Sequence, residues 1–219
     1  MAGDRFPLPA EIAHQVTRVL RLRDGEEITL LDGLGGEARC SLEGDQCVVL
    51  TRSASGEPHH QLSVWQALLK GDHLEPVVRH GTELGIAKFA LMITERCVAT
   101  DLSPRRLERL RAVAREAAEQ SKRGRIPAVE APVSYEEALK AAASGSVLLF
   151  ERHGGQRLTE LEPPPGVFIG PEGGFTQGEV DAAERAGLAI AGLGPRILRS
   201  ETVAVAVAAA ILSRTGDFA

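Results

Sequence analysis

Two glycine-rich segments in the last third of the chain carry the residues best suited to chemistry. Residues 168–175 read FIGPEGGF, and residues 193–202 read LGPRILRSET. Each segment begins where a short apolar run predicts a buried strand, and each leads into a predicted helix. Two such turns lying side by side would expose many backbone N–H and C=O groups in one crevice, which is where open α/β sheets bind small ligands.

The first segment matches neither of the common nucleotide-binding loops. No Lys-Ser/Thr pair follows its glycines, and its spacing differs from the dinucleotide fingerprint G-x-G-x-x-G. A second interpretation is that it is only a turn, with Glu172 placed favourably near a helix N-terminus. Thr176 and Glu179 form a capping-box pattern, which predicts a helix from about Gln177.

Beyond about residue 58, apolar strands alternate with amphipathic helices, which predicts a mostly parallel sheet with helices on both faces. The expected strands are residues 62–69, 89–93, 128–131, 147–150, 167–169 and 188–191. Helices are expected after caps at Asp72, Ser103, Ser134 and Thr176, and Gly85 is expected to end the first of them. Residues 202–212 are apolar almost all round, which predicts a deeply buried helix or a subunit contact.

The N-terminal part has the pattern of a small β-barrel. Residues 27–31, 37–42 and 46–50 read as short strands separated by glycine turns, with a helix expected at residues 9–20. Residues 53–58, SASGEP, read as a linker. We therefore expect two domains, residues 1–58 and residues 59–219.

Charge is distributed unevenly along the chain, although the net charge is only −5. Residues 96–126 hold nine Arg or Lys against four acids, whereas residues 151–187 hold seven acids against three arginines. Arginine-rich helices are often ordinary solvated surfaces, so this pattern supports nucleic-acid binding only together with other signals.

The composition otherwise fits a cytoplasmic enzyme without metal. The longest uninterrupted apolar run, residues 203–212, is too short for a membrane span of roughly 20 residues, and no secretory signal pattern is present. The three cysteines form no C-x-x-C pair, and the six histidines show no ligand spacing.

Taken together, four segments resemble the RsmE-type 16S ribosomal RNA uridine N3-methyltransferases of the knotted SPOUT superfamily. They are the two glycine-rich segments, residues 116–123 (EAAEQSKR) and residues 82–85 (TELG), and they occur in the family's order. His14, residues 19–21 and Gly25 are similar to the family's N-terminal domain. The resemblance implies a PUA-like RNA-binding β-barrel at residues 1–58, an α/β SPOUT domain with a C-terminal trefoil knot at residues 59–219, and a homodimer.

The resemblance also implies the cofactor and the substrate. The cofactor is S-adenosyl-L-methionine, and the reaction is methylation of N3 of a uridine at position 1498 of 16S rRNA, in the decoding region of the small ribosomal subunit. The implied cofactor-binding residues are Leu149, Glu151, Ile169, Gly170, Pro171, Glu172, Gly173, Gly174, Leu193, Gly194, Arg196, Ile197 and Leu198.

Uridine N3 carries a proton, so the site needs a base or groups that stabilise the uridine anion. Arg199 is the first candidate for stabilising the uracil or guiding a phosphate, because arginine offers a rigid fork of donors, and Arg123 is the second. Glu201, or else Glu119 or Glu172, would accept the proton or orient the base. For each, the alternative is a structural Arg–Glu pair. The expected RNA-binding residues are Arg18, Arg21, Arg105, Arg109, Lys122 and Arg123.

Two further functions remain open. In the first, the chain is a SPOUT enzyme that methylates another RNA, such as tRNA or 23S rRNA. In the second, it is a non-catalytic RNA-binding assembly factor whose cofactor pocket no longer works. The intact glycine-rich segments argue against the second function.

Overall fold

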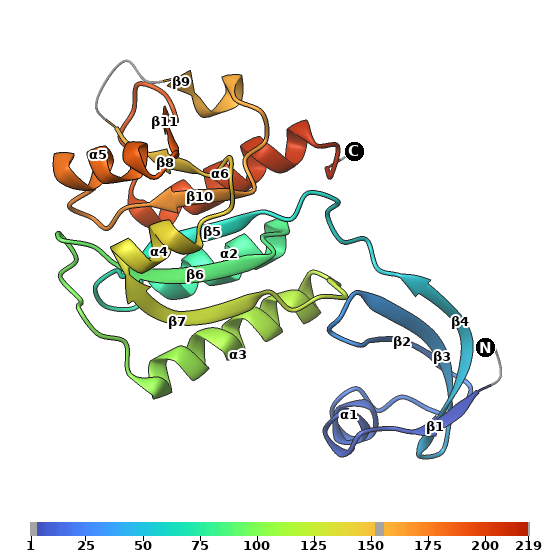
Figure 1. Ribbon diagram of the computed structural model, residues 1–219. Helices are drawn as coiled ribbons and strands as arrows, with labels where there is room; N and C mark the ends of the chain where they lie inside the picture. Colours follow the sequence, from blue (N-terminus) through green and yellow to red (C-terminus); the bar gives the residue numbers. More distant parts are fainter. Residues whose placement is uncertain (1–3, 152–155, 219) are drawn as a thin grey trace. The chain divides into compact units, whose positions relative to one another are not determined.

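The structure, a computed structural model, describes residues 4–151 and 156–218 (Figure 1). The chain forms two compact units. The first comprises Met1–Glu57 with Lys122–Arg125, and the second comprises Pro58–Ser121 with Ile126–Ala219.

The first unit is built on a four-stranded antiparallel sheet. The strand order is β1 (Arg5–Pro7), β4 (Gln46–Ala54), β3 (Gly36–Glu43) and β2 (Glu27–Leu31). The expected N-terminal helix is α1 (Ala10–His14), which continues as a π-helical turn, Gln15–Val19. The three expected strands are confirmed. Strand β1 was missed because three residues ending in proline give no strand pattern.

The expected linker at residues 53–58 is wrong. Strand β4 continues to Ala54, and Ser55 donates hydrogen bonds from its N and Oγ to the carbonyl of Gly35, at 3.0 and 3.2 Å. Glu57 forms an ion pair with Arg123 of the same unit. These bonds come from residues far away in the sequence, so the local composition SASGEP could not show them.

The second unit contains a seven-stranded sheet in which every adjacent pair is parallel. Its order is β7 (Ala128–Ser134), β6 (Lys88–Ile93), β5 (Ser63–Ala67), β10 (Gly166–Ile169), β8 (Val147–Leu149), β11 (Ala189–Gly192) and β9 (Gln156–Arg157). The six expected strands are confirmed. Strand β9 was missed because it is two exposed polar residues at the sheet edge.

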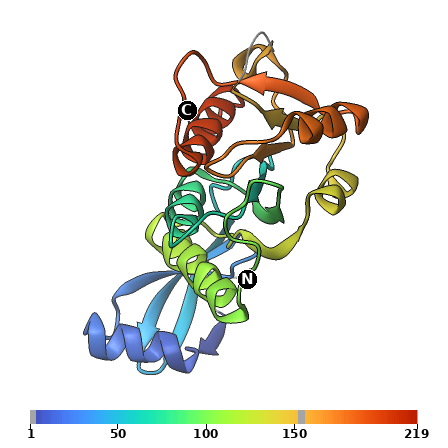
Figure 2. The same ribbon diagram turned by 90° about the vertical axis from the view of Figure 1, so that its left-hand side faces the viewer.

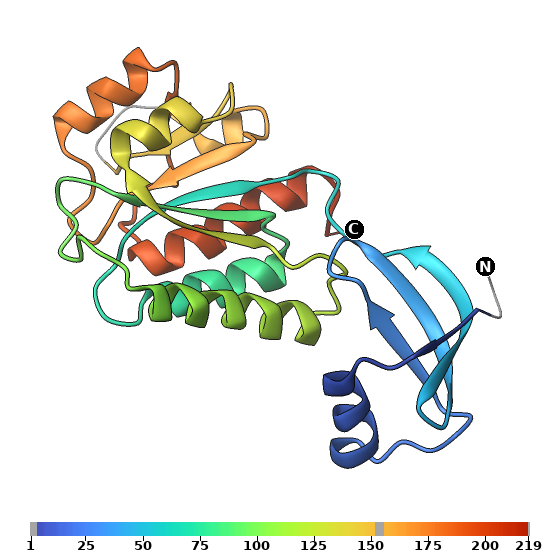
Figure 3. The same cartoon turned by 60° about the horizontal axis from the view of Figure 1, so that its bottom comes forward.

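Helices cover both faces of this sheet, as expected. Helices α2 (Leu74–Leu84), α3 (Pro104–Gln120) and α6 (Ser200–Arg214) lie side by side on one face, whereas α4 (Tyr135–Ala141) and α5 (Gln177–Arg185) lie on the other (Figures 2 and 3). A short 3-10 turn, Leu158–Glu160, follows β9. In the described part of the chain, no helix is long and apolar enough to span a membrane.

Most helix ends follow the sequence signals. Ser103 caps α3 with Pro104 behind it, Ser134 and Thr176 open full capping boxes, and Gly85 ends α2 with φ of +104°. One expectation is wrong. Asp72 does not cap α2, because its N-cap is His73, without a side-chain cap bond. Helix α6 begins at Ser200, whose hydroxyl donates to the Gly170 carbonyl.

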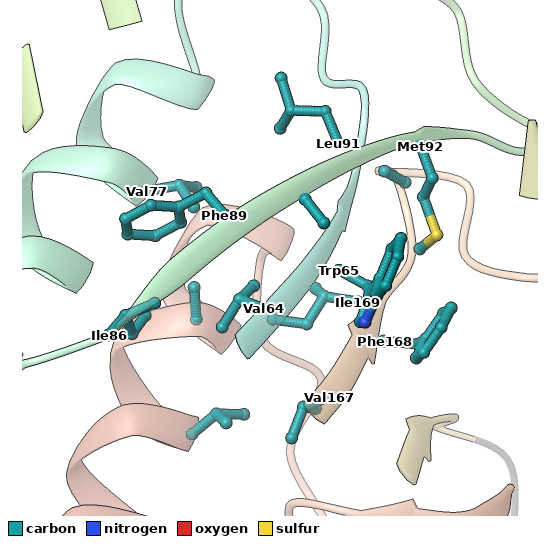
Figure 4. Close-up of a cluster of buried hydrophobic side chains, with 14 of the residues drawn as sticks. Val64, Trp65, Val77, Ile86, Phe89, Leu91, Met92, Val167, Phe168 and Ile169 are labelled. Carbon is teal, nitrogen blue, oxygen red and sulfur yellow. The ribbon is translucent and has the colours of Figure 1, made fainter. Parts of the chain in front are cut away.

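The core of the second unit is centred on the middle strands β5, β6 and β10 (Figure 4). Trp65 stacks on Phe168 with ring centroids 5.2 Å apart, and both residues are at least 95% buried. Helix α6 adds buried Ala204, Val207 and Ile211 on one face, whereas Val203, Val205 and Ala209 are only half-buried. The expected buried helix therefore holds for one face, and the alternative of a subunit contact stays open for the other. This packing fixes the end of β10, from which the first glycine-rich segment emerges.

Candidate active site

A cavity of about 640 Å³ lies where β8, β10 and β11 end. The three strands are parallel neighbours, so their carboxyl ends meet at one edge of the sheet. The cavity is lined by residues 149–151 after β8, residues 169–175 after β10, and residues 191–194 and 196–201 after β11. The crevice expected from the two glycine-rich segments is therefore present.

The first loop, residues 170–175, is held by neighbours on several sides. The Lys70 amide donates to Glu172 Oε1 at 3.1 Å. Arg96 Nη1 donates to the carbonyls of Gly173 and Phe175, at 3.0 and 3.3 Å. Lys70 follows β5 and Arg96 follows β6, so residues beyond the ends of two other strands of the sheet contribute to fixing this loop.

Sequence features at both ends of the first loop explain its conformation. At its start, a Cβ on Gly170 would lie 3.2 Å from the Phe175 ring and 3.3 Å from the main chain of Gly174, so the tight turn requires glycine. At its end, Glu179 of the capping box accepts bonds from the amides of Thr176 and Glu95, both at 2.8 Å. The loop is thereby anchored to the start of α5.

A buried hydrogen-bond chain links the first loop to α6 and to β5. Ser200 Oγ donates to the Gly170 carbonyl at 2.6 Å and accepts from Gln66 Nε2 at 3.0 Å. Gln66 Oε1 is buried and has no hydrogen-bond partner within the described residues. The bonded Ser200 fixes the N-terminal end of α6, and with it the neighbouring Glu201.

The second loop, residues 193–199, is more open. The side chain of Arg199 is 82% exposed, and Ile197 is 77% exposed. Gly194 adopts φ of +119°, with open space where a Cβ would stand. Within residues 4–151 and 156–218, no hydrogen bond ties residues 193–198 to the rest of the unit.

Charged side chains meet at the junction of the second loop and α6. Glu201 Oε1 lies 3.5 Å from His73 Nδ1 and 4.0 Å from Arg199 Nη1. The Glu201 side chain is only 20% exposed, whereas Arg199 extends into the solvent. This arrangement offers a cationic fork for an anionic group beside a carboxylate and an imidazole that can exchange protons.

The structure places all thirteen expected cofactor-binding residues on this one cavity, together with Arg199 and Glu201. Sequence reasoning missed four polar residues that also line it: Lys70, His73, Arg96 and Ser200. A signal was available, because the loops after β5 and β6 end at the same edge of a parallel sheet as the loops after β8, β10 and β11.

Two other candidates lie elsewhere. Arg123 belongs to the first unit, where its buried guanidinium pairs with Glu57, with Nη2 2.7 Å from Oε2. That position fits the alternative of a structural Arg–Glu pair. Glu119 is exposed on α3 and does not line the cavity, whereas Glu172 lines it and is bound by the Lys70 amide.

The expected RNA-binding residues differ in whether another side chain already contacts them. Arg18 and Arg21 of the first unit, Lys122, and Arg105 on α3 are exposed. Arg109 is also exposed, but its Nε and Nη2 both lie 3.2 Å from the carboxylate of Glu75, which raises the pKa of Arg109.

Among the residues that the structure describes, no group of three or more His, Cys, Asp or Glu side chains is placed to hold a metal ion. Cys40, Cys47 and Cys97 are free and buried. Burial raises the pKa of Cys47 to about 11, which keeps its thiol protonated.

Family models match both parts of the chain. A model described as an RNA methyltransferase domain matches residues 56–212, and one described as an RNA methyltransferase PUA domain matches residues 8–50.

Individual relatives carry one recurrent name. The chain is 33% identical to ribosomal RNA small subunit methyltransferase E of Mycobacterium tuberculosis, over 88% of this chain and 80% of the relative. It is 29% identical to the Bacillus subtilis protein of the same name, over 96% and 90%. The solved structure of methyltransferase E from Neisseria gonorrhoeae, bound to S-adenosyl methionine, is 31% identical, with a TM-score of 0.87 over 98% of this chain and 93% of that one.

Proposed function

This chain belongs to the RNA methyltransferase family that includes ribosomal RNA small subunit methyltransferase E, and we propose that it methylates N3 of a uridine in 16S rRNA. The methyl donor is S-adenosyl-L-methionine, and the target is the uridine at position 1498 in the decoding region. The observation that carries this proposal is the convergence of all thirteen expected cofactor residues on one cavity, with Arg199 and Glu201 at its edge.

The cavity fits a nucleoside-type cofactor. Its volume of about 640 Å³ lies within the range of small-molecule sites. Five glycines line it, namely Gly170, Gly173, Gly174, Gly192 and Gly194, and their peptide groups carry no side chain that would keep a ligand from the main chain. When bound, S-adenosyl-L-methionine supplies a methyl group that its sulfonium already makes electrophilic, so the work left to the protein is to prepare the nucleophile.

Preparing uridine N3 requires charge stabilisation beside the cofactor. Arg199 is an exposed cation at the cavity beside the α6 carboxylate Glu201, and its donor fork suits a uracil oxygen that becomes anionic when the N3 proton leaves. Glu201 lies beside Arg199 and is the carboxylate at this edge of the cavity that accepts the proton or orients the base. Because a base inside a helix is out of reach, the target uridine must be unstacked and turned into the cavity.

The rest of the chain serves RNA delivery in this proposal. Residues 1–58 form the PUA-like RNA-binding domain, which the PUA family model over residues 8–50 supports, and residues 59–219 form the methyltransferase domain. Arg18, Arg21, Arg105, Arg109 and Lys122 contact phosphates. The trefoil knot, the homodimer and a cytoplasmic location belong to the same proposal.

The test is transfer of labelled methyl from S-adenosylmethionine to small ribosomal subunits that lack the modification, with mass spectrometry of nuclease fragments. We expect N3-methyluridine in the decoding-region fragment. Transfer to tRNA or 23S rRNA alone would keep the enzyme class and overturn the substrate, and absence of transfer to small subunits despite cofactor binding would direct the search to those RNAs. Absence of transfer together with weak or no cofactor binding would favour the non-catalytic assembly factor.

A further inference from the structure

We propose that His73 is the general base that removes the N3 proton of the target uridine, and that Glu201 holds its imidazole. This inference rests on the proposed function and names the group that function needs, because N3 has no available electron pair until its proton leaves. His73 lines the same cavity as the thirteen cofactor residues and Arg199.

The contact with Glu201 bears on which nitrogen of the His73 imidazole carries the proton. Glu201 Oε1 lies 3.5 Å from His73 Nδ1, and a carboxylate beside this nitrogen favours the tautomer with its proton on Nδ1. The electron pair of neutral His73 is then on Nε2. The same carboxylate stabilises the imidazolium after proton transfer, as the acidic member of a catalytic triad does.

Both partners stand on firmly placed elements. His73 is the N-cap residue of α2, directly after the turn that follows β5. Glu201 lies in the first turn of α6, next to Ser200, whose hydroxyl is bonded to Gly170 and Gln66. The pair therefore brings two helix starts together across the edge of the cavity.

The other charged groups near His73 are either carboxylates that already contact another residue or cations. Asp72 lies 4.0 Å from Arg106 Nη2, and Glu172 accepts the Lys70 amide. Glu201 is thus the carboxylate that directly faces the imidazole. The charged groups to consider around His73 are Lys70, Asp72, Arg106, Glu172, Arg199 and Glu201.

Histidine also suits this reaction better than a carboxylate. A general base works best when its pKa is near the operating pH, and the ordinary values are about 6.5 for histidine and about 4.3 for glutamate. Uridine N3–H is a weak acid, so the stronger base gives the more favourable transfer.

The step balances without a further reactant. The N3–H bond breaks, the proton goes to His73 Nε2, and the electron pair stays on N3. That pair forms the bond to the methyl carbon as the carbon–sulfur bond breaks, with its electrons going to sulfur. The products are N3-methyluridine and S-adenosylhomocysteine, and the imidazolium later returns its proton to water.

The experiment compares His73→Gln with His80→Gln across pH. His80 is a matched control, because its Nδ1 lies 3.2 Å from Glu83 on the same helix, outside the cavity. Single-turnover methyl transfer to unmodified small subunits is measured from about pH 6 to about pH 9, a range that spans histidine ionisation. Thermal unfolding and calorimetric binding of S-adenosylhomocysteine verify that each variant is folded and able to bind.

We expect His73→Gln to be on the order of 100-fold slower near neutral pH, with a rate that keeps rising where the native rate levels off. His80→Gln should keep the native profile. A subunit carrying 5-fluorouridine at the target, whose N3–H is more acidic, should restore much of the rate of His73→Gln. If the His73→Gln variant binds cofactor poorly, methyl transfer by a His73→Gly variant is measured with and without added imidazole. A rate restored by imidazole supports His73 as the general base, and a rate that imidazole does not restore overturns this role.

The result that would overturn the inference is a His73→Gln enzyme within about threefold of the native rate with an unchanged pH profile, against the loss of at least 100-fold expected for a missing base. A native enzyme that forms no N3-methyluridine would instead overturn the proposed function, so the two failures are distinguishable.

Discussion

The two loops that line the cavity are held very differently. The first loop, residues 170–175, receives bonds from Lys70, Arg96 and Ser200. The second loop, residues 193–199, has no such bonds in the described part of the unit, and it exposes Ile197 and Arg199. The first loop thus forms a prepared wall, whereas the second can adjust to what binds.

This difference separates two tasks of the site. A wall that is fixed before binding adds no ordering cost when the cofactor arrives. We expect a loop without such bonds to let a bulky nucleotide enter and then to bring Arg199 to the reacting base, as loops that complete a site on binding do. This separation of tasks would be wrong if the first loop were not needed for cofactor binding, or if the second loop were not needed for methyl transfer.

The largest expected effect is on the open loop. Arg199→Ala should lower the rate of methyl transfer on the order of 100-fold or more, because it removes the cation that stabilises the uracil anion. Cofactor binding and the thermal midpoint should change little, since the side chain is 82% exposed. Single-turnover transfer is the measurement, with exposed Arg185→Ala outside this cavity as control. Near-native turnover of Arg199→Ala would remove the role assigned to this residue.

A change at the first loop should lower the affinity for S-adenosylmethionine rather than the rate of methyl transfer. Arg96→Ala removes two bonds to loop carbonyls and should weaken S-adenosylmethionine binding about tenfold, with near-native transfer at saturating cofactor. Calorimetry measures the affinity. Arg111→Ala is the control, because Arg111 Nε donates to the Val129 carbonyl at 3.2 Å away from the cavity. Equal affinity of both variants would show that Arg96 does not shape the loop.

A glycine from each loop sharpens the comparison through stability. Gly170→Ala should cost about 1–2 kcal/mol, because the turn must give way slightly for a Cβ that would lie 3.3 Å from the main chain of Gly174. Gly194→Ala meets open space instead, and its cost of about 1–3 kcal/mol comes from backbone strain at φ of +119°. Thermal unfolding without ligand measures both. A Gly194→Ala variant as stable as the native chain would contradict the strained backbone of the second loop.

The smallest effect concerns RNA delivery by α3. Arg105→Ala should weaken RNA binding and reduce the salt slope by about 0.9, the value expected for one phosphate contact. Arg109→Ala should have a smaller effect, because Glu75 already engages both sides of its guanidinium. Filter binding at several salt concentrations measures both slopes. Equal slopes for the two variants would show that the contact with Glu75 does not restrain Arg109.

Features encoded by neighbouring residues could be predicted from the sequence. The capping boxes at Ser134 and Thr176 each depend on a glutamate three residues later, and the parallel strands are continuous apolar runs. The cavity followed from the same logic, because strands that end at one edge bring their loops together. Strands β1 and β9 are formed by pairing with distant strands, so their own short sequences carry no signal.

The fate of individual arginines could not be predicted in the same way. Arg123 and Arg199 have the same residue type and both lie in motif segments, but Arg123 is 8% exposed because Glu57, 66 residues away, meets its guanidinium. Arg199 is open because the second loop has no comparable partner. The placement of Lys70 and Arg96 at the first loop likewise depends on long-range contacts.

The measurement that tests the account most directly is backbone NMR relaxation of the native chain with and without S-adenosylmethionine. The account predicts rigid-backbone order parameters, about 0.85, for residues 170–175 before the cofactor is added, and values below about 0.6 for residues 193–199 that rise on binding. Order parameters that are equally low in both loops, or that stay low in residues 193–199 after binding, would contradict it.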